Sequence, residues 1–549
     1  MSVQNASVRE LLNALPKVTV RPAIPPRSSG TSKGPTSSGL RARLAAHLSG
    51  GSLGLTTPLP PPAPARGRRD PLLLLMQRIT HGFHPEEYER ARGMGYQAWL
   101  EEQLAPAGLD DSALETRLEH FTGLTMSPKE LFETFGDDPT RPYMELKIAT
   151  VARAIESKRQ LEQRMVEFWN DHFSIFHDKD LEWMLLPEFD RTVIRPHALG
   201  SFPAMLRASA YSGAMLFYLD NWLNVRGAAQ ENYGREVLEL HTLGVDGGYS
   251  EADVREVAKC LTGWTLELRQ SSPDFMRGKF DSRLHEPGKK FALGHTFSDV
   301  HAARPEEGVQ STEADQVLAV LAAHPSTARF LAKKLVRWFL TPTPPAELVE
   351  RVAQAYLDTQ GDIKAMLRVV LAKENFAATS SVPAPKFRRP FHYVVSLLRL
   401  LDAKAKLSLP NVPLSSEAVT YLEEMGQLPY GRVTPDGYPD TVDAWGSALL
   451  PRWTFAADLL KGNFGGPTMG GFFLANTPEL MARVGFANDP DDRAGLARRM
   501  NDGFFGGQLS PREVDELQAF IREYAGTFGE VAFFDALCLG ASLPGFQWY

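Results

Sequence analysis

The sequence predicts an all-α protein, with a large multi-helix body over residues 71–549, a disordered N-terminal region at 1–70 and at most a minor β-hairpin. Apolar residues recur every three or four positions through most of the body, which is the period of an amphipathic helix. Serine, aspartate and proline stand where such helices would begin. Runs with the two-residue period of strands are scarce. The body forms either one unit or two lobes that meet near 265–312.

Composition and charge narrow the classes of function. The 549 residues are 43% hydrophobic and 23% charged, which is ordinary for a globular protein. The net charge of −7, with both signs interspersed, argues against nucleic-acid binding through a basic surface. The two cysteines, Cys260 and Cys538, exclude a disulfide scaffold and lack the C-x-x-C spacing of a metal site.

The N-terminal region shows no targeting or membrane signal. No run in the chain approaches the roughly 18 apolar residues that a membrane span requires. The first residues lack the basic-then-apolar order of a secretory signal. We therefore expect a cytoplasmic protein, with export by another route as the alternative. Residues 16–70 are rich in proline, serine, glycine and arginine, a composition that buries too little apolar surface to fold.

The helices of the body are predicted in order from their caps and apolar periods. Proline at the first helical position begins several of them, as at Pro85 and Pro325. The expected helices cover 71–79, 85–92, 96–104, 127–135, 143–176, 313–323, 325–340, 345–358, 362–373, 386–402, 415–425 and 446–461. The last one begins after Ser510, an N-cap residue with glutamate at N3. The segment KFALGHTF at 290–297 is the best candidate for a hairpin.

A continuous apolar face runs along the predicted helix 161–176. Its positions are Leu161, Met165, Phe168, Trp169, His172, Phe173 and Phe176. His172 lies inside this face, so its ring needs hydrogen-bond partners, because an unpaired buried polar group costs ~1–3 kcal/mol. We interpret His172 either as a core histidine bonded to a carbonyl or carboxylate, or as a catalytic proton carrier that faces the carboxylates described next.

The densest polar pattern lies at residues 231–264, which are predicted to form a helix, a glycine turn and a second helix. Gly244 ends the first helix, because glycine tolerates the left-handed conformation after a helix. Ser250 caps the second helix, with Asp253 at N3. A polar stripe with the spacing i, i+3, i+4 and i+7 follows one face of the first helix and consists of Asn232, Arg235, Glu236 and Glu239.

Two interpretations fit this stripe. One is a solvent face with an Arg235–Glu239 pair, worth ~0.3 kcal/mol. The other is a pocket in which Glu236 and Glu239, with His172 opposite, carry out acid–base catalysis. In that pocket Arg235 and Asn232 would bind the substrate.

The segment YLDNWLN at 218–224 supplies further oxygen ligands close to the stripe in sequence. Asp220 and Asn221 are ordinary turn and capping residues, and their oxygens are also of the type that divalent cations bind. The pocket hypothesis assigns Asn221 to substrate binding, and Asp220 with Glu236 to a divalent metal ion. No EF-hand, nucleotide-binding or nucleophile motif points to a named cofactor or reaction.

Two loops are candidates to border such a pocket. In the connection at 265–312, the candidates to close over a site are His285, Lys289, Lys290 and His295, and the segment fits either a lid or a plain insertion. The loop at 426–445 is stiffened by prolines and glycines. It forms either a binding wall or a segment packed on the helical body.

Several motifs resemble a known family, the bacterial domain-of-unknown-function family 1800. They are ENYGREVLELHTLG (231–244), LTGW (261–264), FWNDHF (168–173), YLDN (218–221), PDGYP (435–439) and SLPGFQWY (542–549). The resemblance covers about residues 72–549. It implies a largely helical, mostly bacterial and often exported protein, often encoded beside a sulfatase-like partner, and it brings no established reaction.

Two functions follow as hypotheses. The first is an enzyme or ligand-binding protein with a polar pocket that acts on an unknown substrate by acid–base or metal chemistry. The alternative is a non-catalytic structural or assembly protein that binds a partner, such as a sulfatase-like protein, while the same polar residues form a buried structural network.

Overall fold

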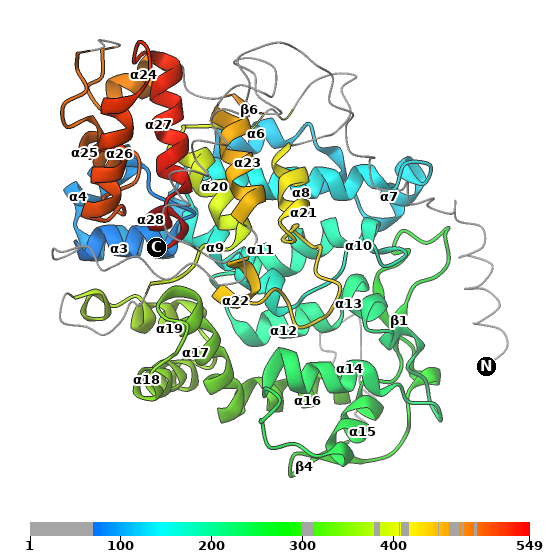
Figure 1. Ribbon diagram of the computed structural model, residues 1–549. Coiled ribbons are helices and arrows are strands. Elements are labelled where there is room, and N and C mark those ends of the chain that lie inside the picture. The colour runs from blue at the N-terminus through cyan, green and yellow to red at the C-terminus, as the bar shows by residue number, and fades with distance from the viewer. Residues whose placement is uncertain are drawn as a thin grey trace.

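Helices build the body, and the strands of the described residues form only two-stranded ribbons (Figure 1). The computed structural model describes residues 70–298, 312–377, 385–405, 407, 417–447, 449–460, 472–473, 477–487 and 491–549. The all-α prediction is confirmed. The predicted disordered region falls, apart from residue 70, outside the described residues. No described helix is both long enough and apolar enough to cross a membrane.

The first half of the body begins with helices that start near the predicted positions, such as the predicted helix 127–135, which starts with a capping box of Ser127 and Glu130. The helices are α3 (Pro71–Ile79), α4 (Pro85–Met94), α5 (Tyr96–Leu104), α6 (Ser112–Leu118), α7 (Pro128–Phe135), α8 (Thr140–Glu156), α9 (Gln160–His172), α10 (Glu182–Phe189), α11 (Arg195–His197), α12 (Phe202–Ala210), α13 (Gly213–Tyr218), α14 (Glu231–Glu236) and α15 (Glu251–Cys260). Two π-helical segments extend α10 and α14: η3 (Asp190–Ile194) and η5 (Val237–Thr242).

The second half continues with α16 (Glu313–Ala323), α17 (Pro325–Phe339), α18 (Ala346–Asp358), α19 (Ile363–Val370), α20 (Pro390–Leu400), α21 (Glu417–Glu424), α22 (Val442–Trp445), α23 (Leu449–Leu460), α24 (Thr477–Arg483), α25 (Leu496–Gly503), α26 (Pro511–Glu523), α27 (Glu530–Ser542) and α28 (Pro544–Gln547). Short 3₁₀ turns are η1 (Pro106–Gly108), η2 (Thr122–Leu124), η4 (Asn221–Leu223), η6 (Ser282–Leu284) and η8 (Lys373–Phe376).

Three antiparallel ribbons complete the described elements. The predicted hairpin is confirmed as β3 (Lys290–Ala292) paired with β4 (His295–Phe297). The other pairs are β1 (Trp264–Leu266) with β2 (Gly278–Phe280), and β5 (Lys404–Ala405) with β6 (Phe472–Phe473).

The predicted helix 143–176 is two helices, because a tertiary contact interrupts it. The Ser157 hydroxyl donates to Asp111 Oδ2 at 2.5 Å, and the backbone N–H of Lys158 donates to Asp111 Oδ1 at 2.8 Å. Both groups are thereby directed toward α6 instead of continuing the helix. The second helix, α9, also ends earlier than predicted, at His172, and the backbone N–H of His177 bonds to the carbonyl of Tyr430 at 2.9 Å.

The buried apolar side chains form two main clusters. The first extends from α3 to α19, and the second combines α6 and α8 with α20, α21 and α23–α28. Residues of β1 to β4 pack in the first cluster, and α8 contributes to both clusters. The division of the body into one unit or two lobes stays a prediction. The two ends of the described chain meet, with α3 and α4 beside α25, α26 and α28 (Figure 1), and the Arg78 guanidinium lies 4.8 Å from the centre of the Tyr549 ring.

The loop at 427–440 is fastened to the body along its length. The Tyr438 hydroxyl bonds back to the Leu428 carbonyl at 2.9 Å, and Lys386 Nζ donates to Asp440 at 2.5 Å. Gly437 has φ +75°, and a Cβ there would lie 2.0 Å from the backbone oxygen of Asp171 on α9. Only glycine lets the loop come this close to the end of α9.

We expect Gly437→Ala to destabilise the protein more than Gly426→Ala. Both glycines belong to the segment 426–445 and have positive φ, +75° at Gly437 and +78° at Gly426, so alanine is strained at each by ~1–3 kcal/mol. Only at position 437 does the new methyl overlap backbone, which adds ~1–3 kcal/mol. Chemical denaturation of the two variants measures the difference, and equal losses would contradict the close packing of the loop on α9.

Candidate functional site

A cavity of about 50 Å³ lies between α9 and the loop at 427–438. Its polar lining includes His81, Glu167, Asn170, Asp171, Arg195 and Tyr430. This volume holds a few water molecules or one small polar group of a ligand. Helix α9 thus has two buried sides: the apolar face predicted from the sequence, and a polar side that borders the cavity.

An ion network forms one wall of this cavity. Glu167 Oε2 accepts from Arg164 Nη1 at 2.7 Å and from His81 Nε2 at 3.2 Å, while its other oxygen accepts from Arg389. Arg389 also donates to Asp171 Oδ2 at 2.6 Å. Arg389 immediately precedes α20, so the network joins α9 to a part of the chain more than 200 residues away.

The two carboxyl groups of the network have opposite pKa shifts. Burial raises the pKa of Asp171 above its usual range, and Arg389 offsets this only in part. Burial acts the same way on Glu167, but Arg164 and Arg389 outweigh it and hold that pKa well below its usual range. Glu167 is therefore a fixed anion, while Asp171 is the carboxylate that takes up a proton more readily.

A second group of side chains closes the other end of the cavity. The Tyr430 hydroxyl donates to Asp190 Oδ1 at 2.8 Å, and Asp190 Oδ2 accepts from Arg195 Nε at 2.5 Å. Among the described residues, Arg195 Nη2 and His81 Nδ1 have no hydrogen-bond partner although both atoms are buried. Two residues of the cavity lining thus retain unused hydrogen-bonding capacity.

His172 is enclosed among aromatic rings, as its apolar face predicts. Its Nε2 donates to the carbonyl of His241 at 3.1 Å, and its Nδ1 accepts from Lys334 Nζ at 2.9 Å. Burial and the nearby Lys334 charge lower the pKa of His172 well below its usual value. Both ring nitrogens are used and neither bonds to Glu236 or Glu239, so the geometry matches the core interpretation.

The carboxylate stripe lies at the surface of α14 and η5. Arg235 forms a bidentate pair with Glu251, at 2.8 and 2.7 Å, and contacts Glu239 at 3.5 Å. Burial, and then Glu239, raise the pKa of the half-buried Glu236. Asn232 is exposed and donates to the Leu219 carbonyl at 3.2 Å. Catalysis and substrate binding by this stripe remain predictions, and the structure does not bring His172 into it.

The side chain of Asn221 has a structural role, because it joins separate segments of the chain by hydrogen bonds. Its side chain is buried and donates to the carbonyls of Leu261 and Trp264 at 3.2 and 3.1 Å, while its oxygen accepts from Asn224 at 3.0 Å. Asp220 is half exposed and pairs with Lys179 at 3.0 Å. Within the described ranges, no three His, Cys, Asp or Glu side chains are grouped as ligands for a metal ion.

The connection at 265–298 is fastened down by its own buried ion cluster. His285 Nε2 and Lys290 Nζ lie 3.1 and 2.5 Å from Glu313 Oε2. Lys289 and His295 are exposed. This cluster therefore joins the β3–β4 ribbon to the start of α16.

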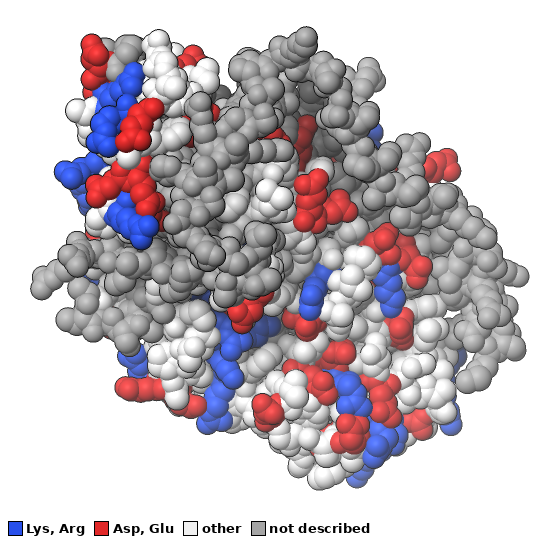
Figure 2. Space-filling view, in the orientation of Figure 1, with Lys and Arg blue, Asp and Glu red and all other residues white. Residues whose placement is uncertain are grey.

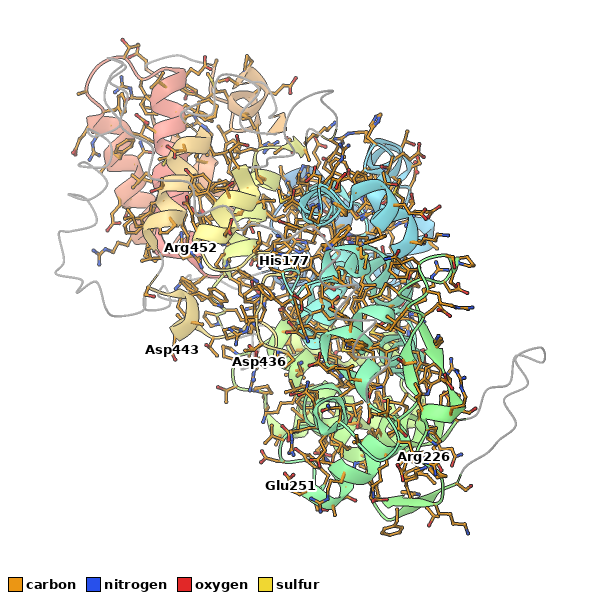
Figure 3. The ribbon with its side chains drawn as sticks, turned by 90° about the vertical axis from the view of Figure 1, so that its right-hand side faces the viewer. His177, Arg226, Glu251, Asp436, Asp443 and Arg452 are labelled. Atoms are coloured by element: carbon orange, nitrogen blue, oxygen red, sulfur yellow. The ribbon has the colours of Figure 1, made fainter. Side chains whose placement is uncertain are left out.

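The loop at 426–445 packs on the body, as one interpretation predicts, and it also lines the cavity. Its role as a binding wall stays a prediction. Two neighbouring residues of the loop face different groups. Gly437 lies against the backbone of Asp171 on α9, and the charge of Asp436 helps to raise the pKa of Glu236. Figure 3 shows Asp436 between the C-terminal helices and α14–α16. On the face seen in Figure 2, acidic and basic side chains are intermixed around α14–α16.

Sequence reasoning missed the cavity residues because it considered only the apolar face of α9, to which Asn170 and Asp171 do not belong. A signal was present: Gln163, Glu167 and Asp171 repeat every four residues opposite the apolar face. The basic run that ends in Arg389 supplies the opposite charge. No local pattern connects these two segments, so their pairing could not be predicted.

Comparison with known proteins identifies one family model, described as "Protein of unknown function (DUF1800)", which matches residues 74–548. No curated protein matches the chain. No solved structure matches it.

We expect Asn221→Ala to lower the free energy of unfolding by ~2–4 kcal/mol, because it leaves two buried carbonyls without their donor. The matched control is Asn232→Ala, whose exposed side chain makes one hydrogen bond and should cost less than ~1 kcal/mol. Chemical denaturation measures both variants. If Asn221→Ala and the wild type are equally stable, the structural role of the Asn221 hydrogen bonds is contradicted.

We expect His241→Phe to stabilise the protein increasingly as the pH falls. Neither ring nitrogen of the buried His241 has a partner among the described residues, and burial lowers its pKa to about 3. In the unfolded wild type, His241 takes up a proton as the pH falls below 6.5, its ordinary pKa, while in the folded protein its ring stays neutral. The wild type therefore loses stability relative to the variant below pH 6.5. The slope is ~1.4 kcal/mol per pH unit down to about pH 3. Chemical denaturation of both proteins at pH 7.5 and pH 5 tests this expectation. A difference in their free energies of unfolding that does not change with pH would contradict it.

Proposed function

Since the chain belongs to the DUF1800 family, whose description names no reaction, we propose its function from the cavity beside α9: the protein is an enzyme that carries out acid–base chemistry on a neutral polar group, with Asp171 as the proton carrier. The observation that supports this most is the pair of carboxyl groups with opposite pKa shifts on one wall of the cavity. Environments that separate two such pKa values are typical of acid–base catalysts.

Each residue of the network has a role in this proposal. Asp171 accepts a proton from a water molecule or a hydroxyl group in the cavity, since its raised pKa makes it the stronger base. Arg389 bridges both carboxylates, and Glu167 keeps that guanidinium in place. Arg195 Nη2 and His81 Nδ1 supply the unused hydrogen-bonding capacity for the bound group.

A neutral group fits the cavity better than an ion. The wall residues Glu167 and Asp171 are paired with Arg164 and Arg389. Arg195 is paired with Asp190, and Arg432 with Asp436 at 3.0 Å, so four acids face four arginines. No excess of either sign is left to neutralise a charged ligand. The small volume then restricts entry to water and to one reactive end of a larger molecule, such as an ester or a glycosidic oxygen.

The same network also supports the alternative of a non-catalytic assembly protein that holds a partner, for which the family resemblance suggests a sulfatase-like protein. A buried ion network can serve only to fix helix positions. The predicted stripe on α14 is the surface that such a partner, or a substrate contacting Glu236 and Glu239, would use.

We expect Asp171→Asn to reduce hydrolysis of p-nitrophenyl esters or glycosides by at least ~100-fold, because it removes the base and keeps the shape. The control is Asp220→Asn, a half-exposed carboxylate paired with Lys179, which should retain full activity. The wild-type rate should rise with pH as Asp171 ionises, above the usual range of an aspartate. If the wild type neither hydrolyses nor is thermally stabilised by any of these compounds, and Asp171→Asn changes only the melting temperature, the assembly function is the correct one.

A further inference from the structure

A buried lysine on α8 stands apart from the cavity chemistry. Lys147 is 2% exposed, and its Nζ lies 3.2 Å from Nε2 of His177 and 4.4 Å from the centre of the Tyr143 ring. The His177 and Tyr143 rings stack at 5.0 Å. Within the described part of the chain, no carboxylate lies within ion-pair distance of this amine. Most buried lysines are paired with an acid, so its surroundings are unusual.

The charged groups around Lys147 do not offset the free-energy cost of burying its charged amine. The acidic residues that act on it are Asp178, just after His177, and Glu423 on α21, and both are exposed to solvent. Burial dominates and lowers the pKa of Lys147 to about 7. Burial and the Lys147 charge lower the pKa of His177 to about 3, so the imidazole is neutral and leaves the amine without a counter-ion.

We propose that Lys147 is a reactive amine that binds small aldehydes covalently as an imine, with His177 as its proton-exchange partner. An uncharged amine has a free electron pair, which the ammonium form of a solvent-exposed lysine lacks at neutral pH. His177, labelled in Figure 3, contacts the amine and is itself half-buried. Access of a small carbonyl compound to the amine requires this half-buried ring to rotate.

The reaction balances without a further reagent. The nitrogen electron pair attacks the carbonyl carbon, the carbonyl oxygen gains two protons and leaves as water, and a C=N bond remains. Both protons come from the two N–H bonds that the uncharged amine loses, and the imidazole passes them on by taking a proton at one nitrogen and releasing it to the oxygen. His177 Nδ1 is buried and has no partner among the described residues, so the ring is not held in one tautomer by a second bond.

The position of Lys147 also relates it to the cavity. Thr150 and Ala154 follow it at i+3 and i+7, so all three lie on one side of α8, and both of those residues line the cavity. Tyr430, another lining residue, accepts the backbone N–H of His177 through its carbonyl at 2.9 Å. The amine therefore lies one helical turn beyond the cavity, and the proposal does not depend on catalysis by Asp171.

The test is reductive trapping of the full-length protein with ¹³C-formaldehyde and cyanoborohydride at pH 7, followed by peptide mass spectrometry. Lys147 should be methylated at least ~10-fold faster than the exposed Lys333, since near pH 7 about half of its amine is uncharged and almost none of an ordinary lysine is. The Lys147 rate should level off above about pH 8, while the Lys333 rate keeps rising.

A variant of Lys147 distinguishes this amine from other lysine amines that are labelled rapidly. Lys147→Met replaces the amine with an apolar chain of similar length, so it should fold and should lose the fast adduct in the intact mass. Circular dichroism checks the fold of the variant. Labelling of Lys147 no faster than Lys333, or a fast adduct that persists in Lys147→Met, would overturn the proposal.

Discussion

The junction between Arg389 and the two carboxylates of α9 is the interaction on which the rest of the structure depends. Arg389 is almost fully buried, and a buried guanidinium is tolerated only when its charge is paired. Glu167 and Asp171 provide that pairing, one helical turn apart, from the opposite half of the chain. The Trp338 ring of α17 also lies 4.3 Å from the same guanidinium. One side chain thus connects α9, α17 and the start of α20.

This junction explains why a polar cavity persists inside a helical body. The ion network needs hydrogen-bond partners on all sides, and apolar packing cannot supply them. The loop at 427–438 meets this requirement from outside, with Tyr430 bonded to Asp190 and Gly437 seated against the end of α9. A space lined by carboxylates, guanidinium groups and hydroxyls is left between the loop and the helix, and the proposed chemistry depends on it.

Much of the fold could be predicted because the signals are local. Helices begin where predicted after Ser127, Ser250 and Ser510, each of which forms a capping box, and so do the helices that start with proline. These starts are predictable because a cap involves only the next few residues. The hairpin at 290–297 is local too. The break at Ser157 was missed because its partner, Asp111, is 46 residues away. The π-helical turn at 237–242 was also missed, and there the Thr242 hydroxyl bonds to the carbonyl five residues back at 2.5 Å.

The sequence by itself determined the helical class, the caps, the apolar face that encloses His172 and the membership of a family without an assigned reaction. Only the tertiary structure decided which polar residues share a cavity. The predicted stripe on α14 and the residues of α9 have similar periods and charges, and a helix pattern specifies which residues share a face but not what that face contacts. Burial separates the two groups: α9 lies against an arginine from a distant segment, while Arg235 and its glutamates remain at the surface.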